Sequence, residues 1–173
     1  LLGTVAAGTQ VPMGPGAACV LSAEPNWWTP LSSMFMHGGW FHILGNLWFL
    51  YIFGDNVEDS MGGVRFLLFY LLCGLAAVAA QVYSDPASPI PMVGASGALF
   101  GLAGGLLAWG YVDRFTLQEA LWPVVRAAGL LLLMNVVMWW ALDGQLAWET
   151  HLGGFICGWV VALIVDPRPR TDE

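Results

Sequence analysis

The sequence predicts an all-α fold, a polytopic transmembrane helical bundle, and three observations support that prediction. Of its 173 residues, 58% are hydrophobic and only 10% are charged, whereas soluble domains contain about 25% charged residues. Its mean hydropathy is +0.69. Five nearly uncharged, helix-length apolar runs follow one another along the chain. Because this number of charged residues is too small to cover the surface of a globular protein, we expect the helices to face lipid.

Residues 1–30 form the first predicted segment, an outer loop or interfacial stretch that precedes the first visible span. Pro12, Pro15 and several glycines interrupt its apolar residues, which argues against a spanning helix. Trp27 and Trp28 are expected to anchor the segment at the membrane interface.

Residues 31–167 form the predicted membrane domain, and residues 168–173 a polar tail. The expected spans cover residues 31–53, 66–82, 93–111, 120–141 and 150–165. Charged residues are expected in the loops, with Asp55, Glu58, Asp59 and Arg65 in the first and Asp113, Arg114 and Glu119 in the third.

All five positive charges fall on one side of this predicted topology. They are Arg65, Arg114, Arg126, Arg168 and Arg170. The positive-inside rule therefore predicts that this side, including the C-terminus, is cytoplasmic. The same topology places the few polar residues of the spans in the outer half of the membrane.

Ser96 is the candidate nucleophile, because it lies in Gly94-Ala95-Ser96-Gly97 at the start of a span. A serine on a tight turn that leads into a helix is held clear of its own backbone. The free amides and dipole of the helix N-terminus would also stabilise an oxyanion. The alternative is a packing serine, which is common in membrane helices.

His151 is the candidate base, because it opens the last span at the same predicted depth as Ser96. Small residues at helical spacing, including Gly97 and Gly101 on one span and Gly154 on the other, should let the two helices approach closely. No Asp or Glu lies within a span to orient the histidine, so a Ser–His dyad is expected. The alternative is a buried histidine bonded to a backbone carbonyl.

His42 and Asn46 are four residues apart and share one helix face. Both are candidate oxyanion donors, and hydrogen bonding between helices is the alternative role. A metal site is not expected, because there is no His-Glu-x-x-His pattern and no carboxylate within a span.

Taken together, these motifs resemble the rhomboid intramembrane serine protease family. The resemblance rests on His37-Gly-Gly-Trp-Phe-His42-Ile-Leu-Gly-Asn46, Gly54-Asp-Asn-Val-Glu58-Asp59, Gly94-Ala-Ser96-Gly97 and His151-Leu-Gly-Gly154-Phe-Ile-Cys-Gly158. It implies a serine endopeptidase that cleaves transmembrane segments of membrane proteins within the bilayer, without a cofactor. It also implies a structural role for His37 near the site, and a six-span core whose first span would precede residue 1.

Two residues depart from the pattern expected of the family. Thr150 stands where a small residue usually precedes the histidine, and Phe100 lacks the hydroxyl that some members carry four residues after the serine. An inactive rhomboid-like protein that binds membrane helices is the alternative function. A transporter is disfavoured because no internal repeat is visible, and nucleic acid binding because no basic patch exists. A bacterial-type plasma membrane is the expected location.

Overall fold

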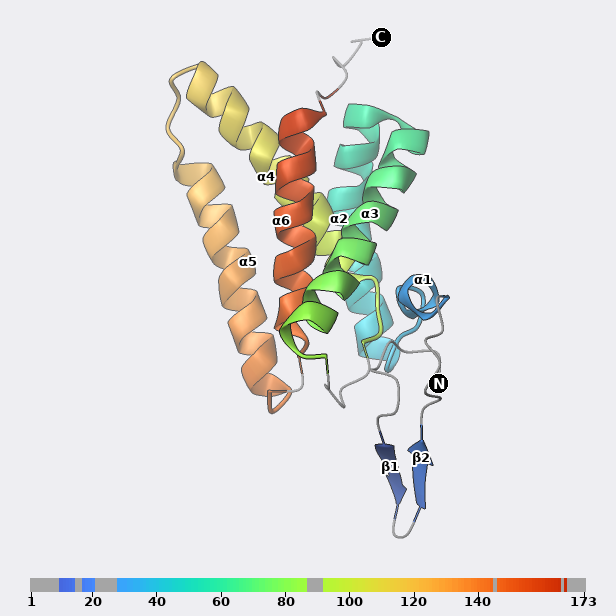
Figure 1. Cartoon of the computed structure of the whole chain (residues 1–173). Coiled ribbons are helices and arrows are strands. Elements are labelled where there is room, and N and C mark those ends of the chain that lie inside the picture. Colours follow the sequence, from blue (N-terminus) through green and yellow to red (C-terminus); the bar gives the residue numbers. More distant parts are fainter. Residues whose placement is uncertain are drawn as a thin grey trace.

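The computed structural model describes residues 10–14, 17–20, 28–86, 92–144, 146–165 and 167. Its helices are α1 Thr29–Ser33, α2 Trp40–Met61, α3 Gly63–Ser84, α4 Ser96–Thr116, α5 Trp122–Ala141 and α6 Trp148–Ile164. A two-stranded antiparallel hairpin, β1 Gln10–Gly14 with β2 Ala17–Val20, precedes them. The five long helices run roughly along one axis, with the hairpin at one end of the bundle and the end of α6 at the other (Figure 1). The all-α helical bundle predicted from the sequence is confirmed.

Helix α4 forms the centre of the bundle. Eleven of its residues are buried, and it packs most extensively against α6, then against α3 and α2. The main apolar cluster joins these helices through Val57, Phe69, Leu99, Leu102 and Ala162, among others. Small residues dominate the first half of α4, so its neighbours can approach its backbone closely.

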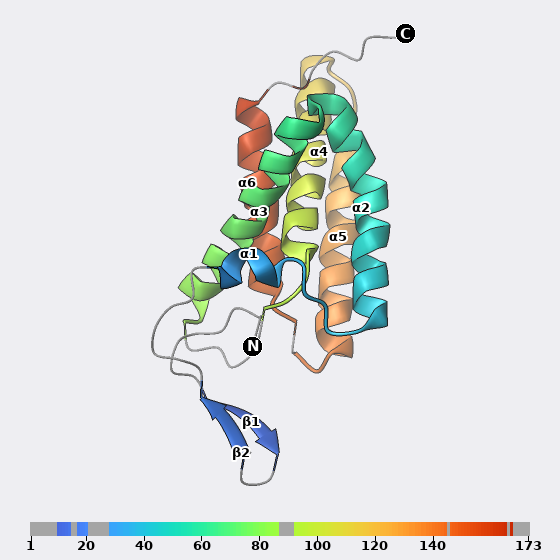
Figure 2. The ribbon, with the colours of Figure 1, turned by 90° about the vertical axis from the view of Figure 1, so that its right-hand side faces the viewer.

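Helix α5 lies on the outside of the bundle. Only Val124 among its residues is buried, and it packs chiefly against α4 (Figures 1 and 2). Its outward face carries large apolar side chains such as Leu132 and Val136, which are 66% and 55% exposed. In water, such an exposed apolar surface would promote aggregation, whereas in a membrane it can contact lipid chains. By length and hydropathy, α3 and α5 each suffice to cross a membrane, and α6 is a shorter apolar helix.

The first predicted span has different limits in the structure. Residues 31–53 were expected to be one helix, but the chain forms the short α1 and then, after His37-Gly38-Gly39, starts α2 at Trp40. Two consecutive glycines favour a break because they lose more conformational freedom than other residues in a helix. Figure 2 shows α1 at the hairpin end of the bundle, where it packs on α3.

The first charged loop was also predicted wrongly. Asp55, Glu58 and Asp59 lie in the last two turns of α2, and Arg65 lies in the first turn of α3. The connection is the single residue Gly62, whose φ of 81° allows a sharp reversal that other residues rarely adopt. The charged residues predicted a loop, but a helix can continue beyond the apolar layer when its last turns are exposed and charged.

The ends of other predicted spans also differ from those of the helices in the structure. Asp113 and Arg114 belong to α4, and Glu149 belongs to α6. The hairpin within residues 1–30 was not predicted. The turn at 87–91 and the tail at 168–173 lie outside the described residues, as does Trp27.

Candidate active site

Ser96 is the first residue of α4, at the hairpin end of the bundle. The preceding loop is fixed by Gly94, which has a φ of 111° and donates its N–H to the carbonyl oxygen of Ser33 at 2.9 Å. Only glycine adopts that φ readily, so Gly94 sets the turn that delivers Ser96 to the helix start. The first amides of the helix have no intrahelical acceptor and mark a positive dipole end.

His151 lies beside Ser96. The Ser96 hydroxyl oxygen is 2.9 Å from Nε2 of His151, a hydrogen-bond distance between α4 and α6. His151 is only 4% exposed. The structure therefore brings the predicted nucleophile and the predicted base together.

Glycine packing makes this contact possible. The Cα of Gly154 faces the carbonyl oxygen of Gly97, and that of Gly158 faces the carbonyl oxygen of Gly101, with no room for a Cβ at either position. A Cβ at Gly97 would also lie 2.5 Å from the Cβ of Ala77 on α3. The close approach of these two helices, predicted from their small residues, is present in the structure.

Two further side chains restrain the His151 ring. Its Nδ1 lies 2.7 Å from Oδ1 of Asn135 on α5. The ring of Phe100 stacks on its face, with ring centroids 4.3 Å apart and an interplanar angle of 4°. Sequence reasoning did not select Asn135, although an uncharged polar residue within the apolar run 120–141 was a usable signal. Phe100, which lacks the family's hydroxyl, contacts the histidine through its ring face instead.

His42 and Asn46 lie one turn apart on α2 and face the turn before Ser96. A Cβ at Gly94 would lie 2.6 Å from Nε2 of His42 and 3.3 Å from Nδ2 of Asn46. The N–H of Gly38 donates to Nδ1 of His42 at 3.2 Å. Because Nδ1 accepts, the neutral ring carries its proton on Nε2, which is the nitrogen nearest Gly94.

Asn46 is buried, and its Nδ2 has no hydrogen-bond partner within the described part of the chain. A buried amide nitrogen without a partner is uncommon and calls for an explanation. Two donors, one on His42 and one on Asn46, therefore converge on the backbone two residues before Ser96. This arrangement could bind an oxyanion that forms on a group attacked by Ser96.

His37 is near the site without joining the Ser96–His151 pair. Its ring packs edge-on against that of His42, with centroids 5.2 Å apart. Across the described residues, no three His, Cys, Asp or Glu side chains are grouped in a way that could hold a metal ion.

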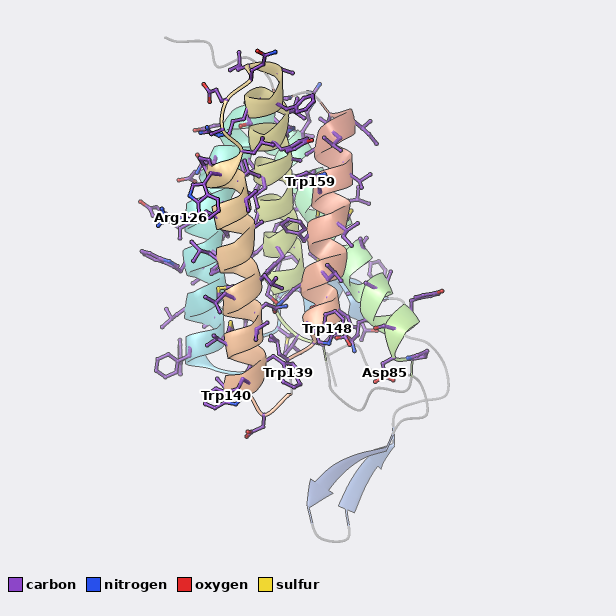
Figure 3. All side chains as sticks on the ribbon, turned by 90° about the vertical axis from the view of Figure 1, so that its left-hand side faces the viewer. Asp85, Arg126, Trp139, Trp140, Trp148 and Trp159 are labelled. Carbon is purple, nitrogen blue, oxygen red and sulfur yellow. The ribbon has the colours of Figure 1, made fainter. Side chains whose placement is uncertain are left out.

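Three tryptophans gather at the hairpin end of the bundle. Figure 3 shows Trp139, Trp140 and Trp148 near the hairpin end, the same end as Asp85, and Arg126 near the opposite end of α5. Tryptophan side chains favour the boundary between lipid and water. Ser96 and His151, which lie in the first turns of α4 and α6, are at the same end of the bundle as these tryptophans.

Comparisons with known proteins identify the family to which the chain is related. Residues 24–168 match the family model of the Rhomboid domain. The chain is 33% identical over 143 residues to rhomboid protease GluP of Bacillus subtilis, covering 82% of this chain and 27% of that protein. It is 27% identical over 150 residues to RHOMBOID-like protein 5 of Arabidopsis thaliana, covering 87% of this chain and 48% of that protein.

The chain spans less than half the length of these curated relatives. Members of the family are integral membrane proteins, which agrees with the apolar outer faces of the bundle. On the match over residues 24–168 and the relatives named above, the chain belongs to the rhomboid family.

Proposed function

We propose that this protein is an intramembrane serine endopeptidase that cleaves transmembrane segments of other membrane proteins by a Ser96–His151 dyad. The observation that carries the proposal is the 2.9 Å contact between the Ser96 hydroxyl and Nε2 of His151. A serine hydroxyl is a weak nucleophile at its own pKa and needs an adjacent base. GluP of Bacillus subtilis, a relative of this chain, is itself named a protease.

In the proposed reaction, the Ser96 oxygen bonds to the scissile carbonyl carbon while its proton passes to Nε2 of His151. The resulting oxyanion accepts hydrogen bonds, and its collapse breaks the peptide C–N bond. The His151 imidazolium gives its proton to the leaving amine nitrogen. A water then attacks the acyl-enzyme and gives a proton to His151, and the departing Ser96 oxygen takes it back.

The proposed oxyanion donors are Nε2 of His42, Nδ2 of Asn46 and the backbone N–H of Ser96. Their support is the free donor of Asn46 and the His42 tautomer that the Gly38 amide enforces. Preorganised donors stabilise charge in the transition state at no further cost of reorganisation. We propose that His37 supports His42 by its ring contact, and that Gly97 and Gly154 serve the helix packing.

The proposed substrates are membrane-embedded protein segments. An apolar hollow of about 290 Å³ lies between α2, α4 and α5, lined by residues such as Phe53, Leu106 and Met134. A lining of this kind suits an apolar chain better than a polar one. No cofactor has a part in the proposed reaction.

For orientation, we propose that the hairpin end and the site face the outside. The arginines of the described residues, Arg65, Arg114 and Arg126, lie toward the opposite end, which the positive-inside rule assigns to the cytoplasm. The C-terminus would then be cytoplasmic, and residues 1–30 would form an outer segment. The proposed membrane is a bacterial-type plasma membrane.

The test is activity-based labelling of the full-length protein in detergent with a fluorophosphonate probe. Wild type should be labelled and should cleave a transmembrane substrate, whereas Ser96→Ala and His151→Ala should abolish both. Ser60→Ala is the matched serine control, because the Ser60 hydroxyl only bonds the carbonyl of Asn56 on the same helix.

The double variant Ser96→Ala/His151→Ala should be no worse than either single variant, because the two residues act as a unit. Turnover that persists in Ser96→Ala would refute the dyad. Absence of labelling and cleavage in a folded wild type would instead favour the alternative, a rhomboid-like protein that binds membrane helices without cleaving them.

A further inference from the structure

Asn135 is unusual within its own helix. From Ala127 to Ala141, every other side chain of α5 is apolar or aromatic, or absent at Gly129. An amide in a lipid-facing helix costs free energy unless it is hydrogen-bonded. Asn135 is partly buried, and its Oδ1 lies 2.7 Å from Nδ1 of His151.

The contact is not a by-product of close packing. Helix α5 packs chiefly on α4, and its contact with α6 is slight. The Asn135–His151 pair therefore joins two helices whose backbones come close at very few positions. Because α5 packs so little on α6 here, the hydrogen bond to His151 is the contact that best explains a polar residue at position 135.

We infer that Asn135 is a positioning residue that holds His151 in the tautomer needed to accept the Ser96 proton. The inference rests on the proposed function. A neutral imidazole has one N–H, and an amide oxygen can only accept. With Oδ1 facing Nδ1, the proton lies on Nδ1, so Nε2 presents its lone pair to the Ser96 hydroxyl.

With the amide in this orientation, the other tautomer would place an N–H of His151 toward Ser96 and two acceptors, Nδ1 and Oδ1, against each other. When Nε2 takes the proton, Nδ1–H still donates to Oδ1, and the bond becomes charge-assisted. Asn135 therefore stabilises the imidazolium more than the neutral ring. Phe100 restrains the same ring through its face, so face and edge are both fixed.

The direct test is ¹⁵N NMR of histidine in the full-length Ser96→Ala variant, which removes the hydroxyl partner of Nε2. The His151 signals are identified by their loss in His151→Gln. We expect a protonated Nδ1 and an unprotonated Nε2, and a shift toward the Nε2–H tautomer on adding Asn135→Leu. Val136→Ala, an exposed neighbour on the same helix, should leave the tautomer unchanged.

An Nε2–H tautomer in the presence of Asn135, or a tautomer unaffected by Asn135→Leu, would overturn the inference. This measurement requires no cleavage, so its result is independent of whether the protein proves to be a protease. Failure of fluorophosphonate labelling would remove the proposed function, and the NMR result would still decide the role of Asn135.

Kinetic measurements on Asn135 variants can tell whether Asn135 positions His151 or only holds α5 against the bundle. Asn135→Leu keeps the branched shape of the side chain without the acceptor, and Asn135→Asp keeps an acceptor oxygen in the same place. We expect Asn135→Leu to lower kcat about 10- to 100-fold, the range seen on losing groups that orient metal-bound histidines. KM should change little, and Asn135→Asp should restore most of kcat.

Replacing an orienting carboxylate by an amide costs roughly 10⁴ in kcat because the histidine then takes the wrong tautomer. The loss expected here is smaller, because Asn135→Leu removes the acceptor at Nδ1 without supplying a donor that would impose the wrong tautomer. A lowered Tm with unchanged kcat in Asn135→Leu would show that Asn135 only joins α5 to the bundle. Failure of Asn135→Asp to restore kcat would equally count against positioning.

Discussion

Gly154→Ala tests whether the backbone contact between α4 and α6 sets the site. A Cβ at Gly154 would lie 2.8 Å from the carbonyl carbon of Gly97. Carbon atoms in ordinary contact are about 3.5–4.0 Å apart. Because the obstacle is backbone, no side chain can rotate away, and α6 must move by about 1 Å.

The same movement would act on the proposed catalytic pair, Ser96 and His151. His151 is three residues before Gly154 on α6, so a shift of about 1 Å would lengthen the 2.9 Å contact to Ser96 beyond a hydrogen bond. A misplacement of about 1 Å can cost about 10² in rate. We therefore expect Gly154→Ala to lower kcat about 100-fold and the free energy of unfolding by about 1–3 kcal/mol through overpacking.

The assay is gel-based cleavage of a transmembrane substrate, below the measured Tm of each variant, with fluorophosphonate labelling in parallel. Gly129→Ala is the control, because a Cβ there meets nothing within 4 Å. Wild-type kcat in folded Gly154→Ala would refute the claim that this glycine contact sets the distance between Ser96 and His151.

Two further predictions concern the oxyanion donors and the orientation. Asn46→Ala and His42→Ala should each lower kcat about 10²- to 10³-fold, as on losing one oxyanion donor, and a change confined to KM would assign these residues to substrate binding instead. In a cysteine-free background, a cysteine at Tyr83, which is 90% exposed near the hairpin end, should react with an impermeant thiol reagent from outside. A cysteine at Leu117, in the loop between α4 and α5, should react only after permeabilisation, and the reverse pattern would contradict the arginine argument.

Much of the site could be predicted because lipid-facing sequences contain few polar residues. Ser96, His151, His42 and Asn46 were conspicuous within apolar runs, and each has a cost that only a polar partner or a function offsets. The small residues around Gly97 and Gly154 predicted which helices meet. Each of these signals lies within a short stretch of sequence, and the packing that they predict involves only α4 and α6.

The limits of α2 could not be predicted in the same way. Hydropathy reports where lipid ends, whereas a helix ends where its backbone hydrogen bonding ends. Charged side chains such as Asp55 and Glu58 can be solvated on an exposed helical turn, so they did not mark the helix end at Met61. The glycines before Trp40 were a signal for its start, but their apolar surroundings concealed it.

Asn135 was missed for a different reason. A carboxylate within a span is the usual orienting group, and its absence from the sequence predicts a dyad without a third member. An amide oxygen accepts the same hydrogen bond without the cost of placing a charge in lipid. Its partner could not be identified from sequence, because His151 lies 16 positions further along the chain, on another helix.

Stability and function make different demands on these polar residues. The Ser96, His151 and Asn135 side chains satisfy one another across three helices, so each lowers the cost of burying the next. Asn46 is different, because its buried Nδ2 has no partner among the described residues. A fold optimised for stability alone would replace it with an apolar side chain of similar size. Its position beside Gly94, next to a proton donor on His42, is explained if the missing acceptor is the oxyanion of a substrate.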